Sequence, residues 1–263
     1  GLEGKPITRV EAACASGAAA VAAGVDSIQA GVDTVLCAGV EIETNVRGRD
    51  GVENMALAAH YAKQRHLEFA LFPYFFARRA KHYKEAFGAG YEDIARVVAK
   101  AYSNAGRNPK ALKRDVEISL EQATTASKHN STFLEDPSLH DHIRILDCTA
   151  FTDGASALVL CSEEGLKQAG ISQSDCAELL SYGHCVRALG AETDPIRMSN
   201  VRDAADIAYR DAGIGPGDIR IGELRDCFSI TEIQLMEALR FVPEGKAPEW
   251  LRAGETEIGG RLP

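Results

Sequence analysis

The chain has 263 residues, 45% of them hydrophobic, and a formal net charge of −9 with a pI near 5.3. That length is enough for one large domain or two small ones with a sizeable core. The negative charge argues against nucleic acid or an anionic membrane as the main partner. No apolar run reaches the roughly 18–20 residues that a membrane-spanning helix needs, because Asp26 interrupts the longest one.

Seven cysteines are scattered along the chain, and no two of them form a C-x-x-C pair. An odd count of this kind suits a reducing compartment better than a disulfide framework. The histidines show no ligand spacing relative to the cysteines, so we expect no zinc or other metal site. The opening residues GLEGKPITRV lack the features of a secretory signal. We therefore expect a cytoplasmic protein, or one of another reducing compartment such as the peroxisome if the source is eukaryotic.

The first stretch, residues 1–44, is predicted to form a strand, a helix and a second strand. The strands are ITRVEAAC and DTVLCAGVE, and the helix between them is ASGAAAVAAGVDSIQAG. This helix is apolar or small on every face until Asp26. We expect it to be buried on all sides between two sheets, because its Ala and Gly residues allow close approach.

Residues 45–145 differ in character, since they are polar and hold most of the aromatic residues. The segments FARRAKHYKEAFG and YEDIARVVAKAYSNAG are predicted helices, joined by irregular connections. We interpret this stretch as a mainly helical excursion from the core.

The core pattern returns at residues 146–170 and continues through 171–263. A turn at Thr152–Gly154 precedes a predicted strand, ALVLCS. After it come a strand, a helix, a strand and a helix: AELLSYGHCV, VRDAADIAYRDAGI, DIRIGELRDCF and ITEIQLMEALRF. Alternating strands and helices indicate an α/β architecture.

Cys14 is the strongest candidate for chemistry on physical grounds. It lies where an apolar predicted strand meets the predicted buried helix, so its sulfur would sit near a helix N-terminus. The unpaired N–H groups there favour a thiolate and can stabilise an oxyanion on an acyl carbonyl. A small, buried core cysteine is the alternative.

Three blocks of the sequence resemble thiolases, especially the sterol-carrier-protein type and the acetyl-CoA acetyltransferases related to it. They are VEAACASGAAAVAAGVDSIQAGVDTVLCAGVE, then ILDCTAFTDGASALVLCSEEGLKQAG, then GELRDCFSITEIQLMEAL with PEG and GETEIGGRLP. The blocks occur in family order and with family spacing. The resemblance implies the thiolase fold, with buried central helices between two mixed sheets and an inserted helical loop domain.

The resemblance also implies roles for two cysteines. Cys14 matches the cysteine that forms the acyl-enzyme, and Cys227 matches the acid/base cysteine that exchanges a proton with the α-carbon. Two thiols suit this reaction, because one must be a good nucleophile and leaving group and the other must move a proton. For Cys227 the alternative is a core cysteine at the end of a strand.

Two departures from the family pattern bear on turnover. Arg225 stands where the family has histidine, giving RDCF in place of HDCF. Arginine is a permanent cation without an acceptor lone pair, so it can bind an oxyanion or turn outward into an ion pair. The family's segment before the nucleophile strand and its Gly-His-Pro segment are not in this sequence, and His184 is expected to be a strand histidine rather than a substitute base. We therefore expect an incomplete thiolase fold.

A basic cluster falls in the predicted loop domain, which covers coenzyme A in the family. Its members Arg78, Arg79 and Lys81 are candidates to meet nucleotide phosphates, against the alternative of a solvated helix face. The resemblance implies coenzyme A as a co-substrate and no tightly bound cofactor. We expect Asp153 and Gly154 to form a turn. Five cysteines are interpreted as packing residues: Cys37, Cys148, Cys161, Cys176 and Cys185.

The leading hypothesis is acyl transfer between coenzyme A thioesters, by thiolytic cleavage of a 3-ketoacyl-CoA or the reverse condensation. The first alternative is a thiolase-like protein that binds acyl-CoA or a partner subunit with weak or no turnover. A related condensing enzyme is the second, disfavoured by the cysteine of RDCF. In the family the strand before the nucleophile pairs across a dimer interface, so we expect a homodimer through residues 7–13.

Overall fold

The computed structural model describes residues 2–190 and 194–263, which divide into two compact units. One unit holds Gly1–Gly51 and Phe151–Leu180, and the other holds Val52–Ala150 and Ser181–Pro263. Each unit is therefore built from two separate stretches of chain. The assignment of 1–44, 146–170 and 171–263 to two half-cores, with 45–145 as a loop domain, stays a prediction.

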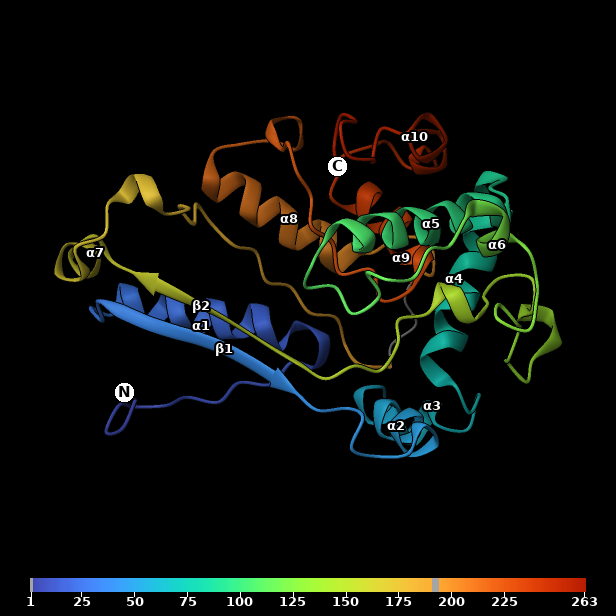
Figure 1. Cartoon of the computed structure of the whole chain (residues 1–263), viewed down its shortest axis with the longest axis horizontal. Helices are drawn as coiled ribbons and strands as arrows, with labels where there is room; N and C mark the ends of the chain where they lie inside the picture. Colours follow the sequence, from blue (N-terminus) through green and yellow to red (C-terminus); the bar gives the residue numbers. More distant parts are fainter. Residues whose placement is uncertain (1, 191–193) are drawn as a thin grey trace. The chain divides into compact units, whose positions relative to one another are not determined.

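The first unit is a two-stranded antiparallel sheet covered by a helix (Figure 1). Strand β1 (Thr34–Glu41) pairs with β2 (Gly154–Cys161) in a register that runs from Thr34↔Cys161 to Glu41↔Gly154. Helix α1 (Ser16–Gln29) packs on this sheet through Gly24. A Cβ added at Gly24 would lie 2.7 Å from the Cys37 sulfur and 2.8 Å from Leu160 Cδ1, so the lack of a side chain permits the close approach.

Two expectations for this unit are wrong. Residues 7–13 are not a strand, because the sheet among the described residues consists of β1 and β2 alone and offers this segment no ladder partner. Helix α1 is not buried on all sides, since Gly24 is its one buried residue. The sheet covers a single face of α1, and the opposite face meets solvent.

Helix α7 (Glu163–Ala169) follows β2 in the first unit. Ser162 caps this helix by accepting a hydrogen bond from Gly165 N at 3.0 Å, and the helix ends at Gly170, whose φ of +68° suits glycine. The turn predicted at Thr152–Gly154 is wrong, because residues 151–153 form an irregular segment and Gly154 is the first residue of β2. Asp153 Oδ1 accepts hydrogen bonds from the backbone N–H groups of Glu43 and Thr44, both at 2.9 Å.

The second unit is a cluster of helices. The longer helices are α4 (Leu71–Phe87), α5 (Tyr91–Arg107), α8 (Ser199–Ala212) and α9 (Ser229–Ala238). The short helices are α2 (Gly48–Met55), α3 (Tyr61–Gln64), α6 (Leu120–Thr124) and α10 (Ala247–Ala253). Helix α2 begins in the first unit. Single 3-10 turns complete the set at Ala13–Ala15, Ala56–Ala58, Pro137–Leu139, Ile145–Asp147, Gln173–Asp175 and Pro216–Asp218.

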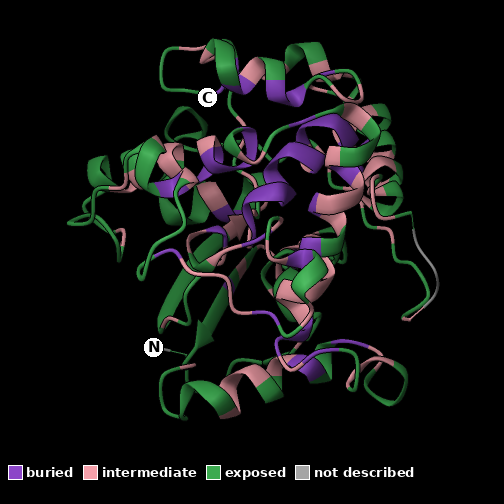
Figure 2. Ribbon diagram, turned by 90° about the vertical axis from the view of Figure 1, so that its right-hand side faces the viewer, coloured by how far each residue is buried: buried purple, intermediate pink, exposed green. Residues whose placement is uncertain are grey.

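Helix α9 lies at the centre of this unit. It contacts α4, α5, α8 and α10, and nine of its ten residues are buried. Figure 2 shows the contrast with the sheet: buried residues gather along the helices, whereas both strands are largely exposed. The core around α9 includes Tyr83, Ile94, Ile233 and Met236.

The four predicted helices of this unit are confirmed, although α4 begins five residues before its predicted start. The predicted strands at AELLSYGHCV and DIRIGELRDCF are wrong, because neither segment pairs along a second strand in the described residues. The one contact of strand type there is the isolated bridge between Cys148 and Phe228.

Two further observations concern membrane helices and metal ligands among the described residues. None of the described helices is long and apolar enough to cross a membrane. Across residues 2–190 and 194–263, no three His, Cys, Asp or Glu side chains gather as metal ligands.

Candidate functional site

Cys14 is exposed and lies in the 3-10 turn Ala13–Ala15, directly before α1. The turn is strained, because Ala13 has a φ of +49°, in the left-handed region that non-glycine residues seldom adopt. Strain of this kind persists only where surrounding contacts impose it, and it often occurs at functional sites. The chain therefore bends sharply at the residue before the candidate nucleophile.

Glu11 and Ser16 hold this turn in place. Glu11 Oε1 accepts a hydrogen bond from Ala13 N at 2.6 Å, and Ser16 Oγ accepts one from Ala12 N at 2.9 Å. The Ser16 hydroxyl also lies 2.7 Å from Ala13 O and 3.0 Å from Glu11 Oε1. The hydrogen bond from Ala13 N, followed by that from Ser16, lowers the pKa of Glu11 and keeps it an anionic acceptor.

Cys227 belongs to the other unit, in the irregular segment before α9. Its backbone oxygen accepts a hydrogen bond from Thr149 N at 3.0 Å, and the next residue, Phe228, forms the bridge to Cys148. Phe228 is buried and stacks on Phe76 of α4, with ring centroids 4.2 Å apart. The backbone on both sides of the Cys227 thiol is thereby fixed.

A buried carboxylate, that of Asp147, fixes the segment around Cys227 through hydrogen bonds. Asp147 is 4% exposed and accepts hydrogen bonds from the hydroxyls of Ser229 and Tyr91, both at 2.5 Å, and from Arg144 N at 2.8 Å. Burial raises the pKa of Asp147, and the three hydrogen bonds oppose the rise. Because Ser229 is two residues beyond Cys227, this carboxylate ties the start of α9 to the residues before β2.

Arg225 is exposed, and Asp226 next to it is half-buried. Burial raises the pKa of Asp226, while the positive charges of Lys100 and then Arg225 oppose the rise. Lys100 Nζ lies 2.5 Å from Glu232 Oε1 on α9, and both side chains are largely buried. Cys227 therefore directly follows one basic and one acidic residue, Arg225 and Asp226.

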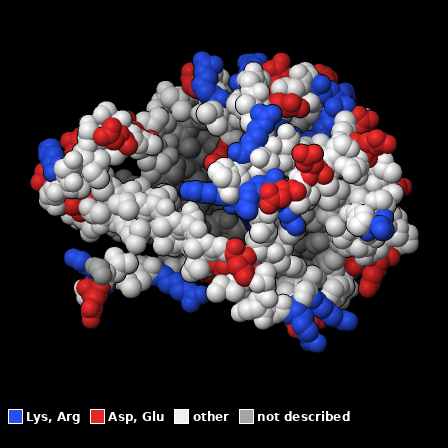
Figure 3. Space-filling view, viewed as in Figure 1, with Lys and Arg blue, Asp and Glu red and all other residues white. Residues whose placement is uncertain are grey.

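The three basic candidates lie on α4 but in different environments. Arg79 is half-buried and donates hydrogen bonds to Pro195 O and Gln234 Oε1, both at 3.4 Å. Burial lowers the pKa of Arg79, and the negative charge of Asp194 opposes that effect. Arg78 is exposed and lies over the Tyr74 ring at 5.8 Å, whereas Lys81 is half-buried. On the face seen in Figure 3, basic and acidic side chains are intermingled.

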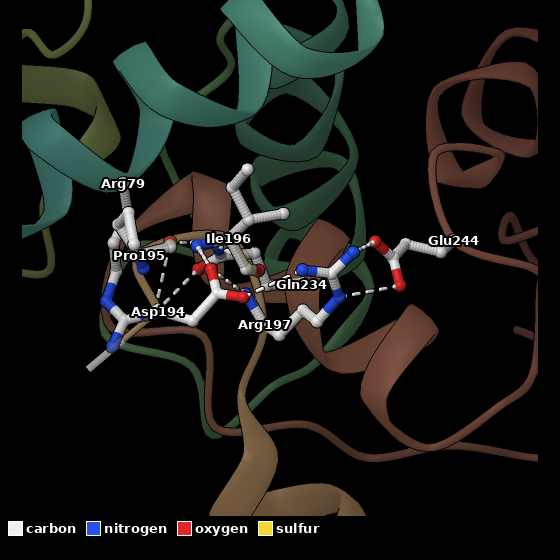
Figure 4. Close-up of polar contacts among 7 residues, drawn as sticks. All are labelled: Arg79, Asp194, Pro195, Ile196, Arg197, Gln234 and Glu244. Atoms are coloured by element: carbon white, nitrogen blue, oxygen red, sulfur yellow. Dashed lines mark hydrogen bonds and ion pairs between the residues drawn. The ribbon is translucent and has the colours of Figure 1, made fainter.

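Arg79 is part of a polar network that fixes the segment at Asp194–Arg197 (Figure 4). Gln234 of α9 donates hydrogen bonds to Pro195 O at 2.8 Å and to Ile196 O at 2.7 Å. The guanidinium of Arg197 bridges Asp194 at 2.8 Å and Glu244 at 2.5 Å. Two helices of the second unit thereby hold an irregular segment through its carbonyl groups.

The other cysteines and His184 have varied surroundings. Cys37 is buried, while Cys148, Cys161 and Cys185 are half-buried, in keeping with packing. The expectation for Cys176 is wrong, because it is exposed in a loop after α7. Burial is the main cause that raises the pKa of Cys148, and Asp147 and Cys227 add to it. His184 lies in an irregular segment rather than in the predicted strand.

Sequence reasoning missed the residues that support the two cysteines. Glu11, Ser16, Asp147 and Ser229 were not singled out, although Glu11 and Ser16 flank Cys14 and Ser229 follows the RDCF motif. A polar residue within three positions of a candidate nucleophile was an available signal. The structure describes Cys14 in one unit and Cys227 and Arg225 in the other, so each half of the candidate site is described within its own unit.

Comparison with known proteins supports the resemblance over the whole chain. Residues 1–164 match the family model for the thiolase N-terminal domain, and residues 181–263 match that for the thiolase C-terminal domain-like fold. An acetyl-CoA acetyltransferase of Methanothermobacter thermautotrophicus is 33% identical over 264 residues, covering 100% of this chain and 65% of that protein. Rat sterol carrier protein 2 is 28% identical over 194 residues, or 72% of this chain and 33% of that protein.

A solved structure extends the likeness to three dimensions. The Ltp2-ChsH2(DUF35) aldolase aligns with 95% of this chain and 62% of its own chain, at a TM-score of 0.68 and 25% identity. The chain thus spans just under two thirds of the length of the acetyltransferase and of this structure. From the two family models and these relatives, the chain belongs to the thiolase family, in the branch that contains the sterol-carrier-protein type.

Proposed function

We propose that the protein transfers acyl groups between coenzyme A thioesters, with Cys14 as the acyl-accepting nucleophile. The supporting observation is the turn at Cys14, where an exposed thiol follows the strained Ala13 and precedes a fourteen-residue helix. N–H groups at such a helix start stabilise negative charge on sulfur or on a carbonyl oxygen. Attack by sulfur on the thioester carbonyl then gives an acyl-cysteine and releases the thiol of coenzyme A.

Cys227 is assigned the acid/base role in this proposal. Its thiolate accepts the proton of the α-carbon in the condensation direction, and its thiol returns a proton in thiolysis. The fixed backbone at Thr149 and Phe228 supports this assignment, because proton transfer needs a group held in position. Arg78, Arg79 and Lys81 stay candidates for the phosphates of coenzyme A, and Arg78 is the most accessible of them.

The second candidate function is binding of acyl-CoA, or of a partner subunit, with little turnover. The observation that favours it is Arg225, an exposed arginine at the position where the family carries histidine. A permanent cation can stabilise an oxyanion but cannot exchange protons at neutral pH. A homodimer stays a proposal for the intact protein.

Acylation separates the two functions. The protein is incubated with acetyl-CoA or acetoacetyl-CoA, and adducts are located by peptide mass spectrometry. We expect an acetyl group on Cys14 that is lost in Cys14→Ala and kept in Cys176→Ala, a matched change at another exposed cysteine. Equal labelling of Cys14 and Cys176 would mean non-specific acylation and would contradict the assignment. Binding of coenzyme A without any adduct would favour the second function.

A further inference from the structure

The direction of the Cys14 thiol depends on one unusual backbone angle. Ala13, directly before Cys14, has a φ of +49°, at which the side chain of a non-glycine residue crowds its own backbone. Rotation about the N–Cα bond of Ala13 turns Cys14 relative to the chain before it. A conformation that alanine disfavours persists only where contacts on both sides of the residue impose it.

The structure shows such contacts on both peptide groups that flank the Cα of Ala13. On the preceding group, Ala13 N donates a hydrogen bond to Glu11 Oε1 at 2.6 Å. The carbonyl of that group, Ala12 O, accepts one from Ala15 N at 3.0 Å. On the following group, Ala13 O accepts a hydrogen bond from the Ser16 hydroxyl at 2.7 Å. Glu11 and Ser16 therefore hold the two peptide groups whose relative rotation defines the conformation of Ala13.

Glu11 and Ser16 also contact each other. Ser16 Oγ accepts a hydrogen bond from Ala12 N at 2.9 Å and lies 3.0 Å from Glu11 Oε1. Glu11 is exposed, so its truncation removes a hydrogen bond without opening a cavity in a core. The contact between Glu11 and Ala13 can thus be removed while the packing of the first unit is kept.

We propose that Glu11 and Ser16 are positioning residues for the nucleophile. They hold Ala13 in its left-handed conformation and thereby fix the direction of the Cys14 thiol for attack on the thioester carbonyl. The inference rests on the proposed acyl transfer by Cys14. Attack on a carbonyl requires the sulfur within a narrow range of distances and angles, so a loosened turn lowers the rate of acylation. The affinity for the thioester should not change, because the hydrogen bonds of Glu11 and Ser16 lie within the turn.

The first test compares two changes at Glu11. Glu11→Gln keeps an oxygen that can accept from Ala13 N, whereas Glu11→Ala removes it, and both variants remove the charge. At saturating acetyl-CoA, we expect the rate constant for acylation of Cys14 to fall about tenfold in Glu11→Ala and less than about threefold in Glu11→Gln. The half-saturating concentration of acetyl-CoA should stay at the parent value. Equal losses in the two variants would mean that charge acts rather than position, and would overturn the inference.

A matched control for this test lies in the same unit. Glu41 is another exposed glutamate, and its Oε1 accepts a backbone hydrogen bond from Ile42 N at 3.0 Å. Glu41→Ala should therefore acylate at the parent rate. A loss in this control as large as that in Glu11→Ala would contradict a specific role for Glu11.

Relief of the strain gives a readout that a folding defect would not reproduce. Glycine adopts a φ of +49° readily, so the turn in Ala13→Gly depends less on Glu11. In that background Glu11→Ala should lower the acylation rate less than about threefold, against about tenfold in the parent protein. A general structural defect would persist, because glycine adds flexibility to the chain. Equal losses in the two backgrounds would contradict a role in holding Ala13.

The second residue is tested by Ser16→Ala, which removes the contact to Ala13 O and should also lower the acylation rate about tenfold. Its matched control is Ser27→Ala on the same helix, because the Ser27 hydroxyl likewise donates to a backbone carbonyl, Ala23 O at 2.8 Å. If Cys14 of the parent protein is not acylated, the acyl-transfer proposal fails and this inference fails with it. If the parent is acylated and the Glu11→Ala and Ser16→Ala variants react at the parent rate, this inference alone fails.

Discussion

Helices α1 and α9 show how little the composition of a helix determines its burial. Alanine, glycine and valine dominate α1, yet one of its fourteen residues is buried. Helix α9 carries Thr231, Glu232, Gln234 and Glu237, yet nine of its ten residues are buried. The difference lies in the neighbours: a two-stranded sheet covers one face of α1, whereas four helices surround α9. The elements that surround a helix therefore decide how many of its residues are buried. Composition decides how much free energy it costs to bury them.

The polar side chains of α9 are tolerated because most of them are paired. Glu232 pairs with Lys100, and Glu237 accepts a hydrogen bond from Tyr83 at 2.5 Å. The side-chain amide of Gln234 donates hydrogen bonds to two backbone carbonyls, Pro195 O and Ile196 O. Thr231 is the exception, since its hydroxyl has no partner in the described structure. A buried charge without its partner destabilises strongly, so α9 should be the more sensitive helix.

The largest effect should come from breaking the Lys100–Glu232 pair. Lys100→Met leaves the Glu232 carboxylate buried and unpaired, and we expect unfolding free energy to fall by about 3–5 kcal/mol at neutral pH. Chemical denaturation followed by circular dichroism measures the loss. The matched control is Lys167→Met on α7, whose ion pair with Glu164 is exposed; about 0–1 kcal/mol is expected there. Similar losses in both variants would refute the contrast between buried and exposed pairs.

The sequence allowed the helices to be predicted better than the strands, for a physical reason. A helix satisfies its hydrogen bonds within one segment, so the pattern of VRDAADIAYRDAGI is sufficient to predict α8. A strand depends on a second segment elsewhere in the chain. The segments DTVLCAGVE and ALVLCS pair as β1 and β2. The segments ITRVEAAC and DIRIGELRDCF have no partner strand among the described residues, so neither forms a strand. Motifs identified the two cysteines, but Asp147 could not be found, because only the folded chain brings it to Ser229.

The next effect tests the packed face of α1 against its open face. Gly24→Ala should lower the unfolding free energy by about 1–3 kcal/mol, because the new methyl group would overlap Cys37 and Leu160. Gly17→Ala has nothing within 4 Å of the added Cβ, and the better helix propensity of alanine should stabilise by up to about 1 kcal/mol. Hydrogen exchange of the α1 and β1 amides reports both changes locally. Stabilisation by Gly24→Ala would show that α1 does not pack closely on the sheet.

The smallest effect is a dependence on pH, and it compares two carboxyl groups in the helical unit. Burial raises the pKa of Glu237 above its ordinary 4.5, with Glu244 adding to the rise and Tyr83 opposing it by donating a hydrogen bond. A raised carboxyl pKa stabilises the fold fully below pH 4.5, and this contribution is lost as pH rises through the folded value. The unfolding free energy of the parent protein, relative to that of Glu237→Gln, should therefore fall as pH rises above 4.5.

Asp93 should behave in the opposite way. Burial tends to raise its pKa, but hydrogen bonds from Arg252 and from Gly90 N lower it below the ordinary 3.8 overall. A lowered pKa gives stability above pH 3.8 that is lost as pH falls through the folded value. The difference between the parent protein and Asp93→Asn should hence shrink as pH falls, and other groups cancel because both proteins share them. Urea denaturation between pH 3 and pH 8 measures both slopes, and slopes of the same sign would mean that ion pairing at Asp93 does not outweigh its burial.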